Sequence, residues 1–255
     1  MHRLPIALLL ALFALAVTAQ ARSAQAQTAS PVPGSFTAQQ RQEIVEVVRG
    51  ALKADPSILR DAVTALQSDE GQKQAQATQA ALAGMEGALQ RTPGDPIAGN
   101  AEGDVTLVEF YDIRCPYCRR MVPVMAELLK ADRRVRVVFK DIPILGPASM
   151  VGARAVLAAQ RQGGYLKMHD ALMTGTPNID AEVVRAAAQK TGLDWERLQR
   201  DMADPAIQAR IDANLALARA LHIDGTPAYV IGGRMLPGAV ELAELQGMVA
   251  AARKR

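Results

Sequence analysis

Cys115-Pro116-Tyr117-Cys118 follows shortly after the apolar run Val105-Thr106-Leu107-Val108-Glu109-Phe110-Tyr111. The run predicts a buried strand, and a proline directly after Cys115 is typical of the first turn of a helix. The chain contains no other cysteine. Two sulfurs three positions apart at a strand-to-helix junction can close into a disulfide and open again, so the pair predicts dithiol redox chemistry.

Strand and helix signals alternate around this pair and indicate the architecture. The predicted strands cover 105–111, 135–139, 228–231 and 234–236, and the predicted helices cover 116–130, about 148–162, 165–173, 181–190, 195–202, 205–221 and 240–252. The first two strands and the helix between them form a βαβ unit, and Gly232-Gly233 predicts a hairpin turn late in the chain. The predicted fold class is α/β, a thioredoxin-like core with a helical domain inserted at about 147–222.

The first residues have the pattern of a secretory signal. Arg3 precedes an apolar stretch over about 4–17, and two small-residue cleavage motifs follow, Ala19-Gln20-Ala21 and Ala24-Gln25-Ala26. We therefore predict a signal peptide over 1–26, cut after Ala21 or Ala26, and a mature protein in the periplasm. The apolar stretch is too short to span a membrane, and an oxidising compartment lets a disulfide persist.

The charge of the chain is close to balanced. It has 29 Lys and Arg against 26 Asp and Glu, and the predicted mature part keeps 27 against 26 because Arg3 and Arg22 leave with the signal. A balance this close to neutral gives no electrostatic argument for binding nucleic acid. We expect no nucleic-acid partner.

Residues 27–91 are predicted to form an amino-terminal helical segment. Asp55-Pro56-Ser57 has the cap and first-turn residues of a helix start, and apolar residues line one side of the predicted helices on both sides of it. Helices this small cannot bury such a stripe alone, so we predict that they pack on the main domain or on copies of themselves, or else serve as a solvated spacer. The turn formers of Thr92-Pro93-Gly94-Asp95-Pro96 place the start of the main domain, 92–255, at this point.

The position of the cysteine pair predicts a different role for each thiol. At a helix start, backbone amides and the helix dipole favour a thiolate, so we assign Cys115 as the attacking thiolate and Cys118 as the buried resolving thiol. Arg114, Arg119 and Arg120 either add to this effect or form a solvated helix face. A zinc site or a purely structural disulfide is the alternative, but the mature chain offers few other ligands and the loop between the cysteines is short.

Gly225-Thr226-Pro227 precedes the strand predicted at 228–231 and is the second element of the site. A proline at a strand start, after a residue held extended, suits a turn that presents backbone groups to an incoming peptide. On its own this pattern indicates only a turn, usually with a trans bond. In combination with the cysteine motif, we assign Pro227 to the catalytic site and Thr226, with Pro116 and Tyr117, to substrate binding. No metal and no bound cofactor are expected, since the disulfide between Cys115 and Cys118 carries the electrons.

Several motifs together resemble the DsbA-like thiol:disulfide oxidoreductases. They are Glu109-Phe110-Tyr111-Asp112, Cys115-Pro116-Tyr117-Cys118, the stretch from Phe139-Lys140-Asp141 to Gly146, and Gly225-Thr226-Pro227-Ala228-Tyr229-Val230-Ile231-Gly232. The segment 44–67 is similar to the start of the copper-sensitivity suppressor subfamily called ScsC. The resemblance implies a cis peptide at Thr226-Pro227 facing the cysteines, and an appendage that in some relatives drives assembly into trimers.

Glu109 stands six positions before Cys115, where similar proteins have a buried acid that helps proton movement at the resolving thiol. We assign Glu109 to the catalytic site on this resemblance, with a solvated side chain at the sheet edge as the alternative. Burial would raise the pKa of its carboxyl group, and Lys140, at the end of the next strand, is predicted to pair with it.

Three functions follow as hypotheses. The first is an exported protein disulfide isomerase or reductase that acts on unfolded or wrongly paired substrate proteins, assembles as a dimer or trimer, is reset by a membrane redox partner and has a possible link to copper tolerance. The second is a monomeric disulfide oxidase of the DsbA type. The third is a Cu(I)-binding protein that uses both thiolates and Met121. The Cys-Pro-Tyr-Cys motif also matches glutaredoxin sites, and Pro116 and Tyr117 leave the direction of electron flow open.

Overall fold

The computed structural model describes residues 36–254, so the predicted signal peptide 1–26 lies outside the described residues. The chain divides into two compact units after Leu66. In the first unit, α1 (Ala38–Ala54) and the start of α2 (Ser57–Gly84) follow the predicted helix signals. Thr37 and Gln40 form a capping box at α1, and Asp55 accepts a hydrogen bond from the Ser57 amide. At both helix starts, a side-chain oxygen therefore accepts a hydrogen bond from a backbone N–H group of the first turn.

The first unit leaves its apolar residues uncovered. No residue of α1 is buried. The exposed large apolar side chains of this unit are Phe36, Ile44, Val45, Val47, Val48, Leu52, Ile58, Leu59, Val63 and Leu66. So many on two short helical stretches form a surface that a partner could cover.

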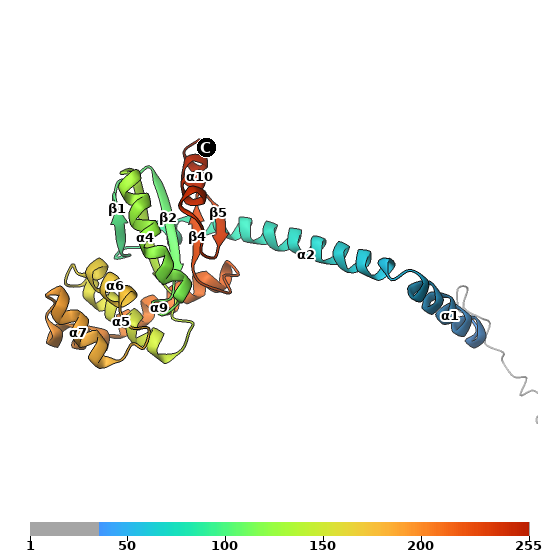
Figure 1. The fold of residues 1–255 in the computed structure, drawn as a ribbon, viewed down its shortest axis with the longest axis horizontal. Coiled ribbons are helices and arrows are strands. Elements are labelled where there is room, and N and C mark those ends of the chain that lie inside the picture. The colour runs from blue at the N-terminus through green and yellow to red at the C-terminus, as the bar shows by residue number, and fades with distance from the viewer. Residues whose placement is uncertain (1–35, 255) are drawn as a thin grey trace, which may run out of the picture. The chain divides into compact units, whose positions relative to one another are not determined.

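The second unit contains one five-stranded sheet (Figure 1). The strands are β1 (Ile97–Gly99), β2 (Val105–Tyr111), β3 (Val135–Asp141), β4 (Ala228–Ile231) and β5 (Arg234–Pro237), in the order β1-β3-β2-β4-β5. β2 pairs parallel with β3, and the other three pairings are antiparallel. The helix α4 (Pro116–Ala131) connects the two parallel strands, so the predicted βαβ unit is present.

Between β3 and β4 the chain forms only helices. They are α5 (Pro147–Gln160), α6 (Tyr165–Thr174), α7 (Ala181–Thr191), α8 (Trp195–Met202) and α9 (Pro205–Ala220), and α10 (Leu242–Arg253) follows the last strand. Asp180, Asp194 and Asp204 begin three of them, and each carboxylate accepts a backbone hydrogen bond in the first turn. A thioredoxin-like sheet interrupted by helices is the architecture that the sequence predicts.

Alternate residues of the strands face two separate cores. Leu107 and Tyr111 of β2 point to the side covered by α4, α10 and the inserted helices. Val108 and Phe110 point to the opposite side, which is covered by the second half of α9, by α3 (Glu86–Gln90) and by the end of α2. This alternation decides which buried side chains can meet.

The end of α2 and all of α3 belong to the second unit, whereas the sequence placed the start of the main domain at 92. Leu82 and Leu89 are buried against the sheet, and the Gln79 side chain donates to the Gly233 carbonyl at 2.8 Å. The strand β1 was not predicted. Its three residues, Ile-Ala-Gly, have no strand pattern of their own, and they form a strand through pairing with β3.

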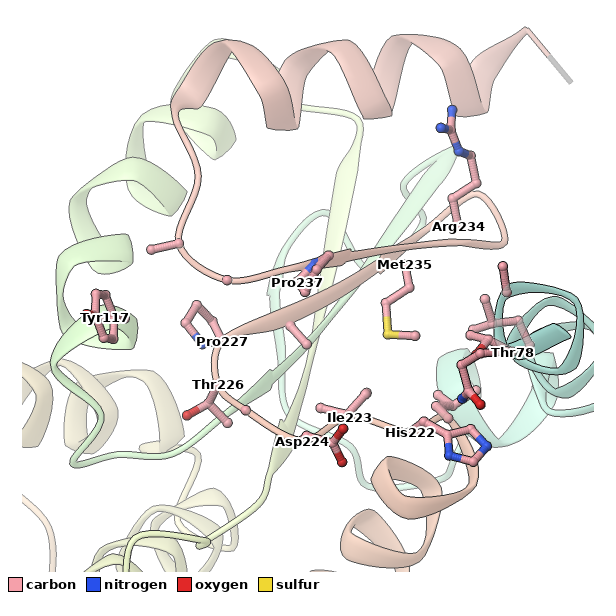
Figure 2. A pocket seen from close by; sticks show the side chains of 18 of the residues that line it. Thr78, Tyr117, His222, Ile223, Asp224, Thr226, Pro227, Arg234, Met235 and Pro237 are labelled. Atoms are coloured by element: carbon pink, nitrogen blue, oxygen red, sulfur yellow. The ribbon is translucent and has the colours of Figure 1, made fainter. Parts of the chain in front are cut away.

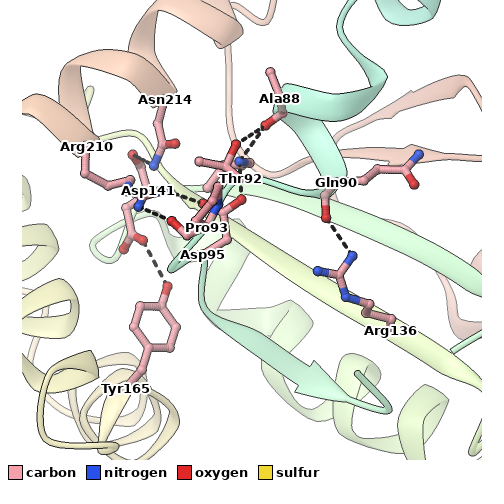
Figure 3. A network of polar contacts seen from close by, with 11 residues as sticks. Ala88, Gln90, Thr92, Pro93, Asp95, Arg136, Asp141, Tyr165, Arg210 and Asn214 are labelled. Atoms are coloured by element: carbon pink, nitrogen blue, oxygen red, sulfur yellow. Dashed lines mark hydrogen bonds and ion pairs between the residues drawn. The ribbon is translucent and has the colours of Figure 1, made fainter. Parts of the chain in front are cut away.

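A buried ion pair joins the segment after α3 to the sheet (Figure 3). The Lys140 Nζ lies 2.6 Å from Asp95 Oδ2, and both side chains are 1% exposed. Lys140 also donates to the Ala88 carbonyl at 2.9 Å, and Arg210 donates to Asp95 Oδ1 at 2.9 Å. Lys140 therefore forms its ion pair on the face of the sheet opposite to Glu109.

Candidate active site

The cysteine pair occupies the start of α4. Cys115 is the N-cap residue, with extended φ and ψ of −62° and 121°, and Pro116 occupies the first turn, where its missing N–H removes no helical hydrogen bond. Both cysteines are free thiols, with Cys115 4% and Cys118 0% exposed. Cys118 lies one turn into the helix within the core, which matches its predicted position as the enclosed thiol.

The two thiols have opposite electrostatic surroundings. The Cys118 thiol, the Thr226 side chain and the backbone N–H groups of Cys118 and Tyr117 lower the pKa of Cys115 to about 5, from a usual value of 9.0. Burial and the neighbouring Cys115 raise the pKa of Cys118. At neutral pH the site therefore holds one thiolate, on Cys115, beside one protonated thiol.

The arginines near the cysteine pair contact backbone carbonyls and the Tyr117 ring rather than the Cys115 thiolate. Arg119 donates to four backbone carbonyls at and just after the end of α6, those of Leu172, Met173, Gly175 and Thr176. Arg114 donates to the carbonyls of Pro177 and Leu145. The Arg120 guanidinium lies 4.6 Å from the centre of the Tyr117 ring. Extra stabilisation of the thiolate by these arginines was one of two interpretations, and these contacts do not support it.

The loop before β4 faces the cysteines. The Thr226–Pro227 peptide bond is cis, as the resemblance implied. The Thr226 carbonyl oxygen lies 3.2 Å from Cys115 Sγ, and the Pro227 carbonyl accepts a hydrogen bond from the Gly238 amide at 2.8 Å. The two sequence elements singled out for the site, 111 residues apart, are thus in contact.

Glu109 is buried beneath the pair, at 5% exposure. Burial raises the pKa of its carboxyl group to about 7, although His169 and the Tyr229 hydroxyl oppose this rise. The predicted partner was wrong, because Lys140 pairs with Asp95. Glu109 aligns with Phe139 in the parallel register and Lys140 aligns with Phe110, so the two side chains point to opposite faces of the sheet.

Beside Glu109 lies a buried polar cluster that sequence reasoning missed. Asp141 accepts hydrogen bonds from the hydroxyl groups of Tyr111 at 2.5 Å and Tyr165 at 3.0 Å; Figure 3 shows the second of these. His169 packs against Tyr111, Phe139 and Tyr165 with ring centres 5.2 to 6.1 Å apart. The sequence showed Asp141 only as part of a motif and gave no spacing that marked His169.

A groove of about 1030 Å³ runs beside the site (Figure 2). Tyr117 and Pro227 lie at one end of it, and Thr78 of α2 lies at the other. The part of α2 from Gly71 to Leu82 forms one wall, and the loop from Leu221 to Ala228 forms another. The groove includes Tyr117 and Thr226 of the predicted substrate-binding residues, while Pro116 is exposed at the helix start outside it.

The thiolate of Cys115 gives a direct prediction for alkylation. The rate of reaction with iodoacetamide should follow the thiolate fraction, so it should fall as the pH drops through about 5 and stay flat toward pH 9.0. The free energy of unfolding of the reduced protein, relative to Cys115→Ser, should instead fall as the pH drops from 9.0 to about 5. The pKa of the Cys115 thiol is lower in the folded protein than in the unfolded chain. Its stabilising effect is therefore complete above the pKa of the unfolded chain, and it is lost as the pH falls to the pKa of the folded protein. A midpoint near 9.0 in the alkylation profile would contradict the site geometry.

Comparisons with known proteins match two parts of the chain. The DSBA-like thioredoxin domain matches residues 106–250, and the copper resistance protein ScsC N-terminal domain matches residues 40–77. A thioredoxin-like oxidoreductase from Silicibacter pomeroyi is 45% identical, with a TM-score of 0.65, covering 66% of this chain and 98% of its own. A linker-deleted variant of Proteus mirabilis ScsC is 28% identical, with a TM-score of 0.65, covering 88% of this chain and 99% of its own.

A curated relative is much longer than the matching region. The Na(+)/H(+) antiporter NhaA 3 of Salinispora tropica is 30% identical over 185 residues, which is 70% of this chain but 28% of the antiporter. Within residues 36–254, no helix combines the length and the apolar character needed to cross a membrane. The matched domain covers more than half of the chain and includes both cysteines and the cis-proline loop. The chain therefore belongs to the family of DSBA-like thioredoxin domains and has an ScsC-type amino-terminal segment.

Proposed function

We propose that this protein exchanges disulfides with substrate proteins, as an exported isomerase or reductase whose subunits assemble through α1 and the start of α2. The observation that carries the proposal is the Cys115 thiol, with its lowered pKa, next to the carbonyl of Thr226, a residue that lines the groove. An extended peptide can pair with the backbone of such a loop while one of its sulfurs meets Cys115.

Disulfide exchange at this site passes through a mixed disulfide between Cys115 and the substrate. The Cys115 thiolate attacks one sulfur of a substrate disulfide, a mixed disulfide forms, and the other substrate sulfur leaves as a thiolate that takes a proton. In reduction, Cys118 then attacks Cys115 Sγ, the Cys115–Cys118 disulfide forms, and the second substrate sulfur leaves. In isomerisation, a different substrate thiol attacks the mixed disulfide and Cys115 is returned unchanged.

Assembly is supported by the exposed apolar residues of the first unit. Copies of this chain are suitable partners, since each would offer the same exposed apolar side chains, with Val47 71% and Leu66 63% exposed. Several sites on one particle would let one site hold a substrate while another reacts. We propose a dimer or trimer, and a periplasmic location that follows from the predicted signal. A membrane redox partner would restore the working state of the cysteines.

A specific observation favours a second function, disulfide donation by a monomer. A stabilised thiolate on Cys115 favours the reduced form and makes the disulfide a stronger oxidant. A link to copper tolerance is supported by the match of residues 40–77 to the N-terminal domain of the copper resistance protein ScsC. Copper binding has less support. Met121, the third predicted ligand, is 2% exposed in the core, and the described residues contain no group of three or more His, Cys, Asp or Glu side chains that could hold a metal ion.

Refolding assays separate the two leading functions. We expect the mature protein to reactivate scrambled ribonuclease, and fast oxidation of reduced ribonuclease without unscrambling would instead support the oxidase. The paired variant Val48→Asp/Leu52→Asp should give a monomer by light scattering, because it places charges on the exposed apolar surface of α1. It should lose unscrambling and keep oxidation. Arg41→Glu is the matched control on the same helix, and a wild-type monomer would refute the assembly.

A further inference from the structure

The resolving thiol has a proton that it must lose before it can attack. Cys118 is 0% exposed, and both burial and the thiolate of Cys115 oppose its ionisation. Glu109 is close enough to affect the pKa of Cys118 and can accept this proton. Glu109 is itself buried, however, so the proton needs a further path to solvent.

A cavity provides a path from Glu109 toward the surface. It has a volume of about 180 Å³, enough for several water molecules, and it lies between α4, α6 and the sheet. Most of its lining is apolar, including Met121, Met125 and Phe139. The titratable groups that line it are Glu109, His169 and Asp170.

Among the residues that line the cavity, His169 links the buried Glu109 to the exposed Asp170. Its side chain is 7% exposed, and its Nδ1 lies 3.0 Å from Oδ1 of Asp170, whose side chain is 63% exposed. Its ring is held by Tyr111, Phe139 and Tyr165. A ring fixed in this way can pass a proton between a water in the cavity and the Asp170 carboxylate.

We propose that His169 is a proton-relay residue that acts through Glu109, and that the proton of Cys118 leaves through the cavity between α4 and α6. The proposal rests on the proposed function. In the step concerned, the Cys118 proton passes to Glu109, then through water to His169, Asp170 and solvent. The Cys118 sulfur forms its bond to Cys115 Sγ, and the substrate sulfur departs with the electron pair of the broken bond.

The titratable groups around Glu109 and His169 are consistent with proton transfer from Cys118 toward solvent. Glu109 faces Cys118 on α4, Tyr229 on β4 and His169 on α6. His169 faces Glu109 and Tyr111 on β2, Asp141 on β3, and Tyr165 and Asp170 on its own helix. Burial raises the pKa of Glu109 to about 7 and that of Asp141 to about 6, so both carboxyl groups can exchange protons near neutral pH.

The test separates the two thiols with dithiobis(nitrobenzoate) and the reduced full-length mature protein. Attack by Cys115 releases the first thionitrobenzoate in a phase that depends on reagent concentration. Attack by Cys118 releases the second in a first-order phase. Thionitrobenzoate leaves as an anion, so the second phase requires proton loss from Cys118 alone. Cys118→Ser should show the first phase only.

His169→Gln should slow the second phase about 10-fold near neutral pH and leave the first phase unchanged. The difference should shrink at high pH, where hydroxide takes over the proton. In His169→Ala, imidazole should restore the rate and pyrazole, a ring of the same size but a far weaker base, should not. Met173→Leu, which also lines the cavity, and Lys167→Gln, exposed on the same helix, should behave as wild type.

A wild-type rate and pH profile of the second phase in His169→Gln would overturn the proposal, as would equal effects of imidazole and pyrazole. If the His169 variants do not fold, Asp170→Asn decides, because the Asp170 side chain is largely exposed and its loss should slow only the second phase. Failure of the proposed function gives a different result, since the wild type would then lack a rapid first phase or its Cys118→Ser variant would keep the second.

Discussion

Replacement of Cys118 by serine should leave substrate proteins attached to Cys115 as mixed disulfides, and turnover should stop. The structure gives the reason. Cys115 keeps a thiolate at neutral pH, so the first attack does not need Cys118 as a nucleophile, whereas release into the Cys115–Cys118 disulfide does. Cys118 is fully enclosed, and no substrate can reach it directly. The adduct should appear on non-reducing gels and in intact mass, and dithiothreitol should remove it.

Cys115→Ser is the matched control and should form no adduct at all. It keeps one thiol in the chain, Cys118, which is buried and whose pKa is raised. Exchange activity should fall to the level without enzyme, because a serine hydroxyl does not ionise to a nucleophile here as the thiol does. Equal trapping by both variants would contradict the assigned roles, as would trapping by Cys115→Ser alone.

The cysteine site was predictable because its chemistry is encoded locally. A strand, a proline-started helix and the cysteine spacing place the thiols at a helix start without knowledge of the tertiary fold. The turn pattern marked the loop at Pro227, but its cis peptide bond and its position opposite the cysteines came only from the resemblance, since a threonine before a proline does not by itself indicate which distant residue it will contact. The structure brings its carbonyl to 3.2 Å from Cys115 Sγ.

Other parts of the site depend on pairings that the sequence does not encode locally. The predicted contact of Glu109 with Lys140 failed because it used proximity along neighbouring strands and ignored the alternation of side chains. His169 and the α2 wall of the groove were missed for a related reason. The inserted helix α6 and the second half of α2 each pack on the sheet from a distant part of the chain, and no periodicity predicts which face they cover.

Asp95→Asn should cost about 3–5 kcal/mol of the free energy of unfolding, because it leaves a buried ammonium group without its counterion. Lys140 is 1% exposed, and the variant would keep it near Arg210 and Arg136, which already disfavour its charge. Urea unfolding followed by circular dichroism measures the loss. Asp69→Asn is the control, since Asp69 pairs with Lys73 on the surface and should change stability by less than about 1 kcal/mol.

The double variant Asp95→Leu/Lys140→Met should recover most of this loss. Burial raises the pKa of Asp95 and lowers that of Lys140, so for both groups desolvation outweighs the attraction between them. An apolar pair of similar size removes both charges and both desolvation costs, while Arg210, whose side chain is 25% exposed, can turn to solvent. A double variant as unstable as Asp95→Asn would mean that the pair holds the segment after α3 more by the hydrogen bond from Lys140 to the Ala88 carbonyl than by its charge.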